Sequence, residues 1–206
     1  IEAPRFPVAE TWEDLLNQVR GLANEDHAFK TVCLDTTDAA SILAERHACE
    51  KEGWEGIETP GFGKGHTKVK ELWTHMLDGF QWLYQNKNMN VILLSHVAVK
   101  PFNDAINEPY DRWEMRCHKQ VNALIKDWVD FNFFANFEVN LQKDGSKNRA
   151  ISYGNRALFT KFAAGYDAKS RIELPNKLNF DWSSFMDAYQ AALAPPKPQP
   201  VKKGAK

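Results

Sequence analysis

The sequence has few cysteines, no long apolar run and no clear excess of charge of either sign. Its three cysteines, Cys33, Cys49 and Cys117, form no Cys-x-x-Cys pair and cannot all pair with one another, which is typical of a protein from a reducing cytoplasm. The nearby His47 and His118 complete no zinc-binding spacing with them, so we expect no zinc site. No apolar run approaches membrane-spanning length and no signal peptide is visible, so we expect no membrane partner.

The charge balance argues against a uniformly basic nucleic-acid binder. The 206 residues include 26 Lys and Arg and 27 Asp and Glu, a net charge of −1, which still permits local basic patches. This length and a hydrophobic content of 43% suit one globular α/β domain. We expect that domain to occupy residues 1–193, and the Pro- and Lys-rich residues 194–206 to form a disordered tail.

A short apolar run, Lys30–Leu34, ends at Asp35 and is followed by three good helix N-cap residues, Thr36, Thr37 and Asp38. The pattern predicts a strand and then a helix over residues 37–50. A carboxylate at the C-terminal end of a parallel strand lies where open α/β sheets bind ligands, and in P-loop NTPases such an Asp helps to hold Mg²⁺. The alternative is that Asp35 only caps the helix.

A second apolar run, Val91–Leu94, predicts a central parallel strand buried on both faces. It ends in Ser95 and His96. If the two strands are parallel neighbours, these polar side chains lie beside Asp35 at one edge of the sheet. The alternative for His96 is an ordinary hydrogen-bonded neutral imidazole.

The segment 53–66 is rich in glycine and must form a long loop. It and the start of the next helix combine aromatic rings with cations, which is typical of a surface that contacts single-stranded DNA. The residues concerned are Trp54, Phe62, Lys64, His66 and Lys68. A flexible surface loop with incidental charge is the alternative. The loop is no Walker A motif, because Lys64 precedes Gly65 rather than following the last glycine.

Periodicity and turn residues predict the remaining elements. We expect residues 97–109 to be irregular, helices over 12–22, 67–86, 110–128 and 183–192, strands over 131–141 and 156–161, and a turn over 143–148 with a hairpin partner over 149–153.

The order of these elements resembles the RecA-like ATPase core. More specifically, the chain is similar to the phage-encoded minimal RecA-like ATPases, or single-strand-annealing recombinases, of the AAA/P-loop NTPase superfamily. The resemblance is carried by Lys30–Asp35, Cys49–Trp54, Gly61–Gly65, Met89–His96, Glu108–Arg112 and Tyr166–Arg171, and it covers about residues 6–182. It implies an α/β fold: a mostly parallel sheet flanked by helices, with a C-terminal antiparallel hairpin region.

The resemblance also implies residue roles. Asp35 and Thr36 would bind ATP and Mg²⁺, with Asp35 reaching the metal through water, and Ser95 and His96 would occupy the sensor position. The segments 53–66 and 97–111 would be the two DNA-binding loops, the second with Lys100 and Arg112. Lys169 and Arg171 would extend into the nucleotide site of a neighbouring subunit, where cations stabilise charge on the γ-phosphate.

The implied protein is a phage ATP-dependent recombination or annealing protein in the cytoplasm of a bacterial host. It would act as a homo-oligomer on single-stranded DNA, with nucleotide at the subunit interfaces and with a single-strand DNA-binding protein as a possible partner. The alternatives are a non-catalytic RecA-like module or a hexameric helicase-type motor. The family's Walker A and catalytic Glu would precede residue 1, so we expect this chain alone to bind ATP weakly, to lack turnover and to expose an unpaired sheet edge.

Overall fold

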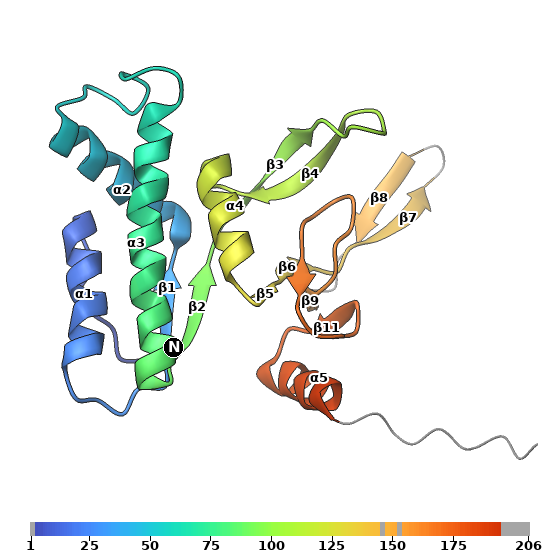
Figure 1. The fold of residues 1–206 in the computed structure, drawn as a ribbon. Helices are drawn as coiled ribbons and strands as arrows, with labels where there is room; N and C mark the ends of the chain where they lie inside the picture. The colour runs from blue at the N-terminus through green and yellow to red at the C-terminus, as the bar shows by residue number, and fades with distance from the viewer. Residues whose placement is uncertain (1–2, 145–146, 152–153, 195–206) are drawn as a thin grey trace, which may run out of the picture. The chain divides into compact units, whose positions relative to one another are not determined.

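The computed structural model describes residues 3–144, 147–151 and 154–194 (Figure 1). Its contacts divide the chain into two compact units, Ile1–Val129 (unit 1) and Asp130–Lys206 (unit 2). The sequence suggested one continuous domain over residues 1–193. Most of the expected tail, residues 195–206, lies outside the described residues.

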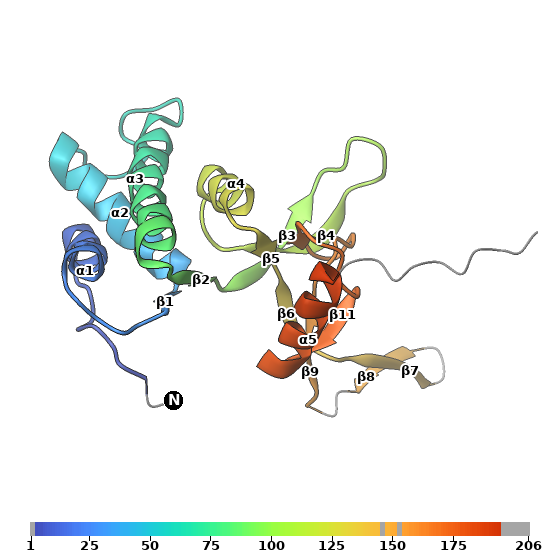
Figure 2. The ribbon, with the colours of Figure 1, turned by 60° about the horizontal axis from the view of Figure 1, so that its bottom comes forward.

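The helices of unit 1 form its hydrophobic core. They are α1 (Trp12–Asn24), α2 (Thr37–Glu52), α3 (Lys64–Lys87) and α4 (Lys119–Trp128). Figures 1 and 2 show α1 and α2 lying against the long α3. The indole rings of Trp12 and Trp73 pack with their centroids 5.8 Å apart, and Phe80 and Leu83 are buried on the same face of α3. Both α1 and α2 begin at threonine N-caps, as their sequences predict.

Two strands of unit 1 form the parallel pair that positions the site. β1 (Thr31–Asp35) pairs with β2 (Asn90–Leu94) in a register that runs from Thr31 opposite Asn90 to Asp35 opposite Leu94. Every second side chain, including Val32 and Leu93, packs on the helical core. The opposite face is exposed, with Leu94 at 43%, so the prediction that β2 is buried on both faces was wrong.

The segment after β2 differs from its prediction. Residues expected to be irregular and then helical form an antiparallel hairpin of β3 (Val97–Phe102) and β4 (Tyr110–Met115), and α4 begins only at Lys119. Aromatic and β-branched side chains pair across this hairpin: Val99 lies opposite Trp113, and Phe102 opposite Tyr110. Such cross-strand pairs favour a strand over the helix that the spacing of apolar residues suggested.

The glycine-rich loop ends earlier than predicted, because α3 starts at Lys64 rather than Thr67. Gly65 explains why this first turn can lie so close to the loop. A Cβ at position 65 would stand 1.9 Å from the carbonyl oxygen of Ile57, so only glycine fits there without a backbone shift.

Unit 2 is built from short strands and one helix. These are β5 (Phe131–Asn132), β6 (Phe134–Phe137), β7 (Asn140–Asp144), β8 (Lys147–Ile151), β9 (Arg156–Phe159), β10 (Lys169–Ser170), β11 (Lys177–Asn179) and α5 (Trp182–Leu193). One antiparallel sheet has the order β11-β9-β6, β5 pairs with β10, and β7 pairs with β8.

The pairing confirms the predicted hairpin of β7 and β8, although its turn residues 145–146 lie outside the described residues. The single strand expected over residues 131–141 is broken into β5, β6 and β7. The α/β class holds, but among the described strands β1 and β2 form the sole parallel pair, so a mostly parallel sheet is not observed. Parallel neighbours need a long crossover such as α2–α3, whereas antiparallel neighbours can follow one another closely in the sequence, as β7 and β8 do.

Candidate functional site

The ends of β1 and β2 bring the predicted polar residues to one edge of the parallel pair. Because Asp35 lies opposite Leu94, Ser95 and His96 follow directly after its partner. The Asp35 carboxylate is exposed on the open face of β1, and the imidazole of His96 is 62% exposed. The predicted juxtaposition of Asp35 with Ser95 and His96 therefore rests on an observed parallel register (Figure 1).

Asp38 holds His96 in place. Its two carboxylate oxygens accept hydrogen bonds from the His96 backbone N–H at 3.1 Å and pair with the imidazole Nδ1 at 3.0 Å. Burial opposes ionisation of Asp38, but the hydrogen bonds from the His96 side chain and backbone, with a further one from Thr36, outweigh it and lower the pKa of Asp38 to about 2. Nδ1 is thus committed to Asp38, and Nε2 is the ring nitrogen left to contact a ligand.

Sequence reasoning placed Asp38 only among the N-cap residues of α2 and missed this pair. The two residues are 58 positions apart, and the contact depends on the strand pairing that aligns the end of β2 with the first turn of α2. The one sequence signal was a second carboxylate three residues after Asp35.

The hydroxyls of Thr36 and Ser95, at the same edge, form hydrogen bonds with backbone groups. The Thr36 side chain accepts a hydrogen bond from the Ala39 backbone N–H at 3.3 Å and caps α2, and the Ser95 hydroxyl donates to the carbonyl of His96 at 3.1 Å. Thr36 therefore caps the helix, as its sequence context also allowed. Its predicted contact with nucleotide stays a prediction.

A buried polar cluster fixes the first turns of α2 behind this edge. The Trp73 indole donates to the Ser41 hydroxyl at 3.0 Å, and the Cys117 thiol lies 3.3 Å from Ser41 and 3.5 Å from the Thr37 hydroxyl. Burial raises the pKa of the Cys117 thiol, although its hydrogen bonds with Ser41 and Thr37 act against that rise. The cluster links α2 to α3 and to Cys117, which follows β4. It therefore fixes the first turn of α2, which carries Asp38.

The carboxylate at the end of β1 fits the way proteins bind Mg²⁺. In the described part of the chain, no group of three or more His, Cys, Asp or Glu side chains is arranged to hold a metal ion by itself. Mg²⁺ keeps several waters and is bound through one or two carboxylates together with substrate phosphates, so a single exposed Asp35 is a sufficient protein ligand. Asp38 is engaged with His96, whereas Asp35 is exposed to solvent; its predicted role as a Mg²⁺ ligand stays a prediction.

Comparison with known proteins places this chain in a family. Residues 1–172, most of the chain, match the family described as AAA domain. The chain belongs to the AAA domain family. It is therefore a nucleotide-binding domain of the P-loop NTPase superfamily, as the arrangement of Asp35 and His96 also suggests. No curated protein and no solved structure shows a significant match. No helix within the described residues is long and apolar enough to span a membrane.

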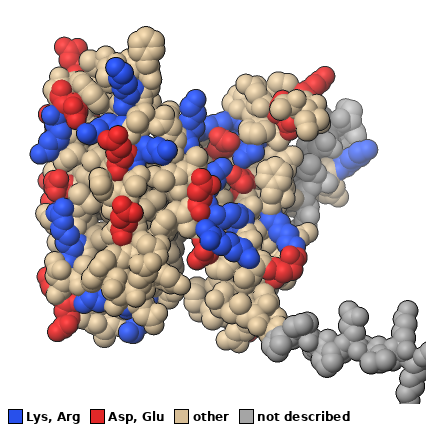
Figure 3. Space-filling model, in the orientation of Figure 1, with Lys and Arg blue, Asp and Glu red and all other residues tan. Residues whose placement is uncertain are grey.

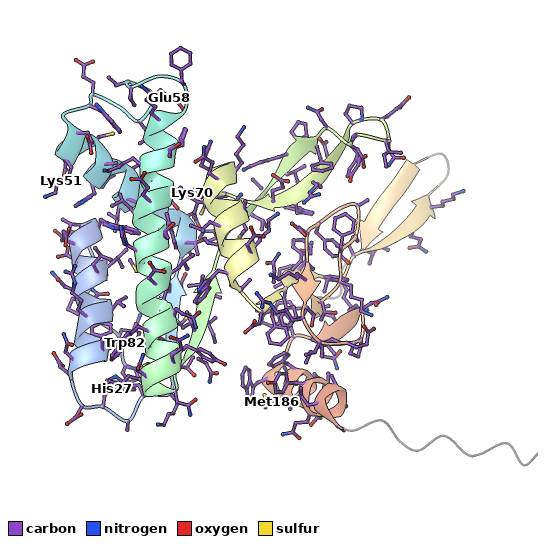
Figure 4. The ribbon with its side chains drawn as sticks, in the orientation of Figure 1. His27, Lys51, Glu58, Lys70, Trp82 and Met186 are labelled. Atoms are coloured by element: carbon purple, nitrogen blue, oxygen red, sulfur yellow. The ribbon has the colours of Figure 1, made fainter. Side chains whose placement is uncertain are left out.

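Most of the residues that the sequence predicted to contact DNA instead contact other residues of unit 1. Trp54 packs against the core. His66 pairs with Glu58 at 2.7 Å, in the loop that precedes α3 (Figure 4), and stacks on His118 with ring centroids 3.7 Å apart. Lys68 pairs with Glu52 at 3.1 Å.

The hairpin of β3 and β4 shows the same engagement. Lys100 donates to the carbonyl of Met115 at 3.1 Å, and Arg112 is 6% exposed, pairs with Glu114 and stacks over the ring of Phe102. Of the seven predicted DNA-contact residues, Phe62 and Lys64 are the exposed ones; Phe62 lies in the loop just before α3, and Lys64 is the first residue of α3. The structure brings no single DNA surface together from the seven.

The predicted trans residues, Lys169 and Arg171, lie in unit 2, whereas Asp35 and His96 lie in unit 1. Lys169 is in β10, opposite Asn132. Arg171 pairs with Asp130 at 3.2 Å, yet its side chain is 56% exposed. A role for these cations in a neighbouring subunit's site stays a prediction.

A separate apolar cleft of about 330 Å³ lies between α1 and α3. Its lining includes Leu16 and Val19 from α1 and Leu72 and Gly79 from α3. It contains none of the predicted site residues.

Proposed function

We propose that this AAA domain serves an ATP-dependent enzyme that acts on single-stranded DNA. The observation that carries the proposal is the edge of the β1–β2 pair, where an exposed Asp35 lies beside a His96 that Asp38 holds in place. Phosphoryl transfer depends mainly on positioned charge. This edge presents a carboxylate suited to Mg²⁺ next to an imidazole that can donate a hydrogen bond to a phosphate oxygen.

Each residue of this edge has a distinct role in the proposal. Asp35 would hold Mg²⁺, which when bound would supply positive charge close to the phosphates of the nucleotide. His96 donates from Nε2 to a phosphate oxygen when both ring nitrogens carry protons, because Asp38 occupies Nδ1. Loss of the γ-phosphate removes that acceptor, so the orientation of His96 and Ser95 reports the state of the nucleotide to the β3–β4 hairpin that begins at Val97.

The assembly follows from the same chemistry. Several copies of the chain bind one single strand, each with nucleotide at a subunit interface, and Arg171 of one subunit approaches the γ-phosphate bound by its neighbour. The exposure of Arg171 supports this arrangement. The biological process is recombination or strand annealing, as in the phage proteins that the sequence resembles.

The decisive experiment measures ATP hydrolysis by the native protein, with and without oligo(dT). Asp35→Asn should lower kcat about 100-fold or more, because a positioned group that stabilises transition-state charge is commonly worth that factor. Asp26→Asn is the matched control, since Asp26 is an exposed carboxylate just before β1. Wild-type turnover by Asp35→Asn, with measurable hydrolysis by the native protein, would refute the proposed role of this edge.

A further inference from the structure

Charge is distributed unevenly between the two units. Residues 130–206 contain 12 Lys and Arg against 7 Asp and Glu, a net charge of +5, whereas residues 1–129 contain 14 against 20, a net charge of −6. The near-neutral total hides a basic C-terminal half. Four of its cations are lysines of residues 195–206, outside the described residues, and residues 130–194 hold 8 Lys and Arg against 7 Asp and Glu. Figure 3 shows Lys and Arg side chains gathered over the part of unit 2 that holds β6 and β9.

Within unit 2, two phenylalanines flank an arginine across the three-stranded sheet. Phe137 at the end of β6 lies directly opposite Arg156 at the start of β9, and the backbone N–H of Phe180, just after β11, donates to the carbonyl of Arg156 at 3.3 Å. The guanidinium carbon lies 5.8 Å from the ring centroid of Phe137 and 5.6 Å from that of Phe180. We call Phe137, Arg156 and Phe180 the aromatic row.

The aromatic row is open to solvent. Phe137 is 51% exposed, Phe180 is 47% exposed, and Arg156 is exposed as well. No carboxylate among the described residues forms an ion pair with Arg156, whereas its neighbour Lys177 is paired with Glu138. The guanidinium therefore keeps N–H donors for an external anion while its plane stays near two aromatic faces.

We propose that the aromatic row is a binding site for single-stranded nucleic acid. Unpaired bases stack on Phe137 and Phe180, and Arg156 between them binds the phosphate that links those bases. A duplex offers its phosphates but not its base faces, so the row selects single strands. The choice of DNA rests on the proposed function, whereas the stacking geometry does not. The site belongs to unit 2, whereas the loops that the sequence singled out belong to unit 1.

The test is binding of the 206-residue chain to a fluorescein-labelled oligo(dT) of about 20 nucleotides, longer than the ~4–16 nucleotides that one such surface covers. Fluorescence anisotropy gives Kd. Phe137→Ala and Phe180→Ala should each raise Kd about 5-fold or more, the loss expected for one stacked base. Phe137→Leu should raise it similarly, because leucine retains apolar bulk without a flat ring. The leucine variant guards against a result caused by misfolding.

Arg156 has a separate signature. Each phosphate that a cationic side chain neutralises on a single strand contributes about 0.7 to the slope of log K against log salt concentration. Arg156→Ala should reduce the slope by that amount, while the phenylalanine variants should leave it unchanged. A structural defect would not separate the variants in this way.

Phe62→Ala is the matched control, since Phe62 is a fully exposed phenylalanine in unit 1. If Phe62→Ala weakens binding and the variants of the row do not, the loop of unit 1 carries the DNA and the aromatic row is refuted, while the proposed function stands. Equal affinity for duplex would refute stacking. If the native chain binds no single strand, both the row and the proposed action on DNA fail. A change in mass by light scattering without a change in Kd would identify the row as a contact between copies and would also overturn it.

Discussion

The pair of Asp38 and His96 makes the sharpest prediction about unit 1. Asp38→Ala removes the acceptor for both the imidazole and the backbone N–H of His96. A carboxyl whose pKa falls from its ordinary 3.8 to about 2 contributes at most about 2.5 kcal/mol to stability. Because the His96 side chain is 62% exposed, solvent screening reduces that figure, and we expect a loss of about 1–2 kcal/mol at pH 7.

The pH dependence of this loss has a defined sign. The folded-state pKa of Asp38 is lower than its unfolded value, so the contribution is present above about pH 4 and is lost as the pH falls toward 2. The difference in unfolding free energy between wild type and Asp38→Ala should therefore shrink over that interval. Above pH 4 the contribution of the Asp38 carboxyl itself is constant.

The assay is urea unfolding followed by tryptophan fluorescence, which reports mainly on unit 1 because six of the seven tryptophans lie there. A double-mutant cycle with His96→Ala isolates the imidazole bond and should give a coupling of about 0.5–1.5 kcal/mol. Asp78→Ala, at an exposed position on α3, is the control and should change stability by less than about 0.5 kcal/mol. A coupling below about 0.3 kcal/mol would show that Asp38 does not position His96.

Three further outcomes are expected. Gly65→Ala should lower the unfolding free energy by about 1–3 kcal/mol, because its Cβ would overlap backbone, whereas Gly56→Ala, with open space around it, should have little effect; equal unfolding midpoints would contradict the packing at the start of α3. Cys117 should resist alkylation at pH 8 until urea unfolds the protein, since burial covers the thiol and raises its pKa; labelling of the folded chain, located by mass spectrometry, would refute its burial. Arg171→Ala should abolish DNA-stimulated hydrolysis with nucleotide affinity retained, and mixing it with an Asp35→Ala subunit should restore part of the activity; unchanged turnover would disprove the trans role.

Local sequence determined the elements whose signals are contained in a few neighbouring residues. The threonine N-caps, the apolar stripe of α3 and the ends of β1 and β2 were predictable because capping and amphipathic spacing act over short distances. The same reasoning failed at residues 110–118. There the apolar spacing allowed a helix, but pairing with β3, as between Trp113 and Val99, stabilises a strand instead.

Only the tertiary structure decided which of the candidate residues work together. The contact between Asp38 and His96 and the row of Phe137, Arg156 and Phe180 each join segments that are far apart in the sequence. Their positions depend on strand register, and a shift of one residue would turn each side chain to the opposite face. The sequence by itself therefore supplied the reactive groups at the strand ends. The pairing of strands fixed which groups meet, because register is set by long-range packing rather than by neighbours along the chain.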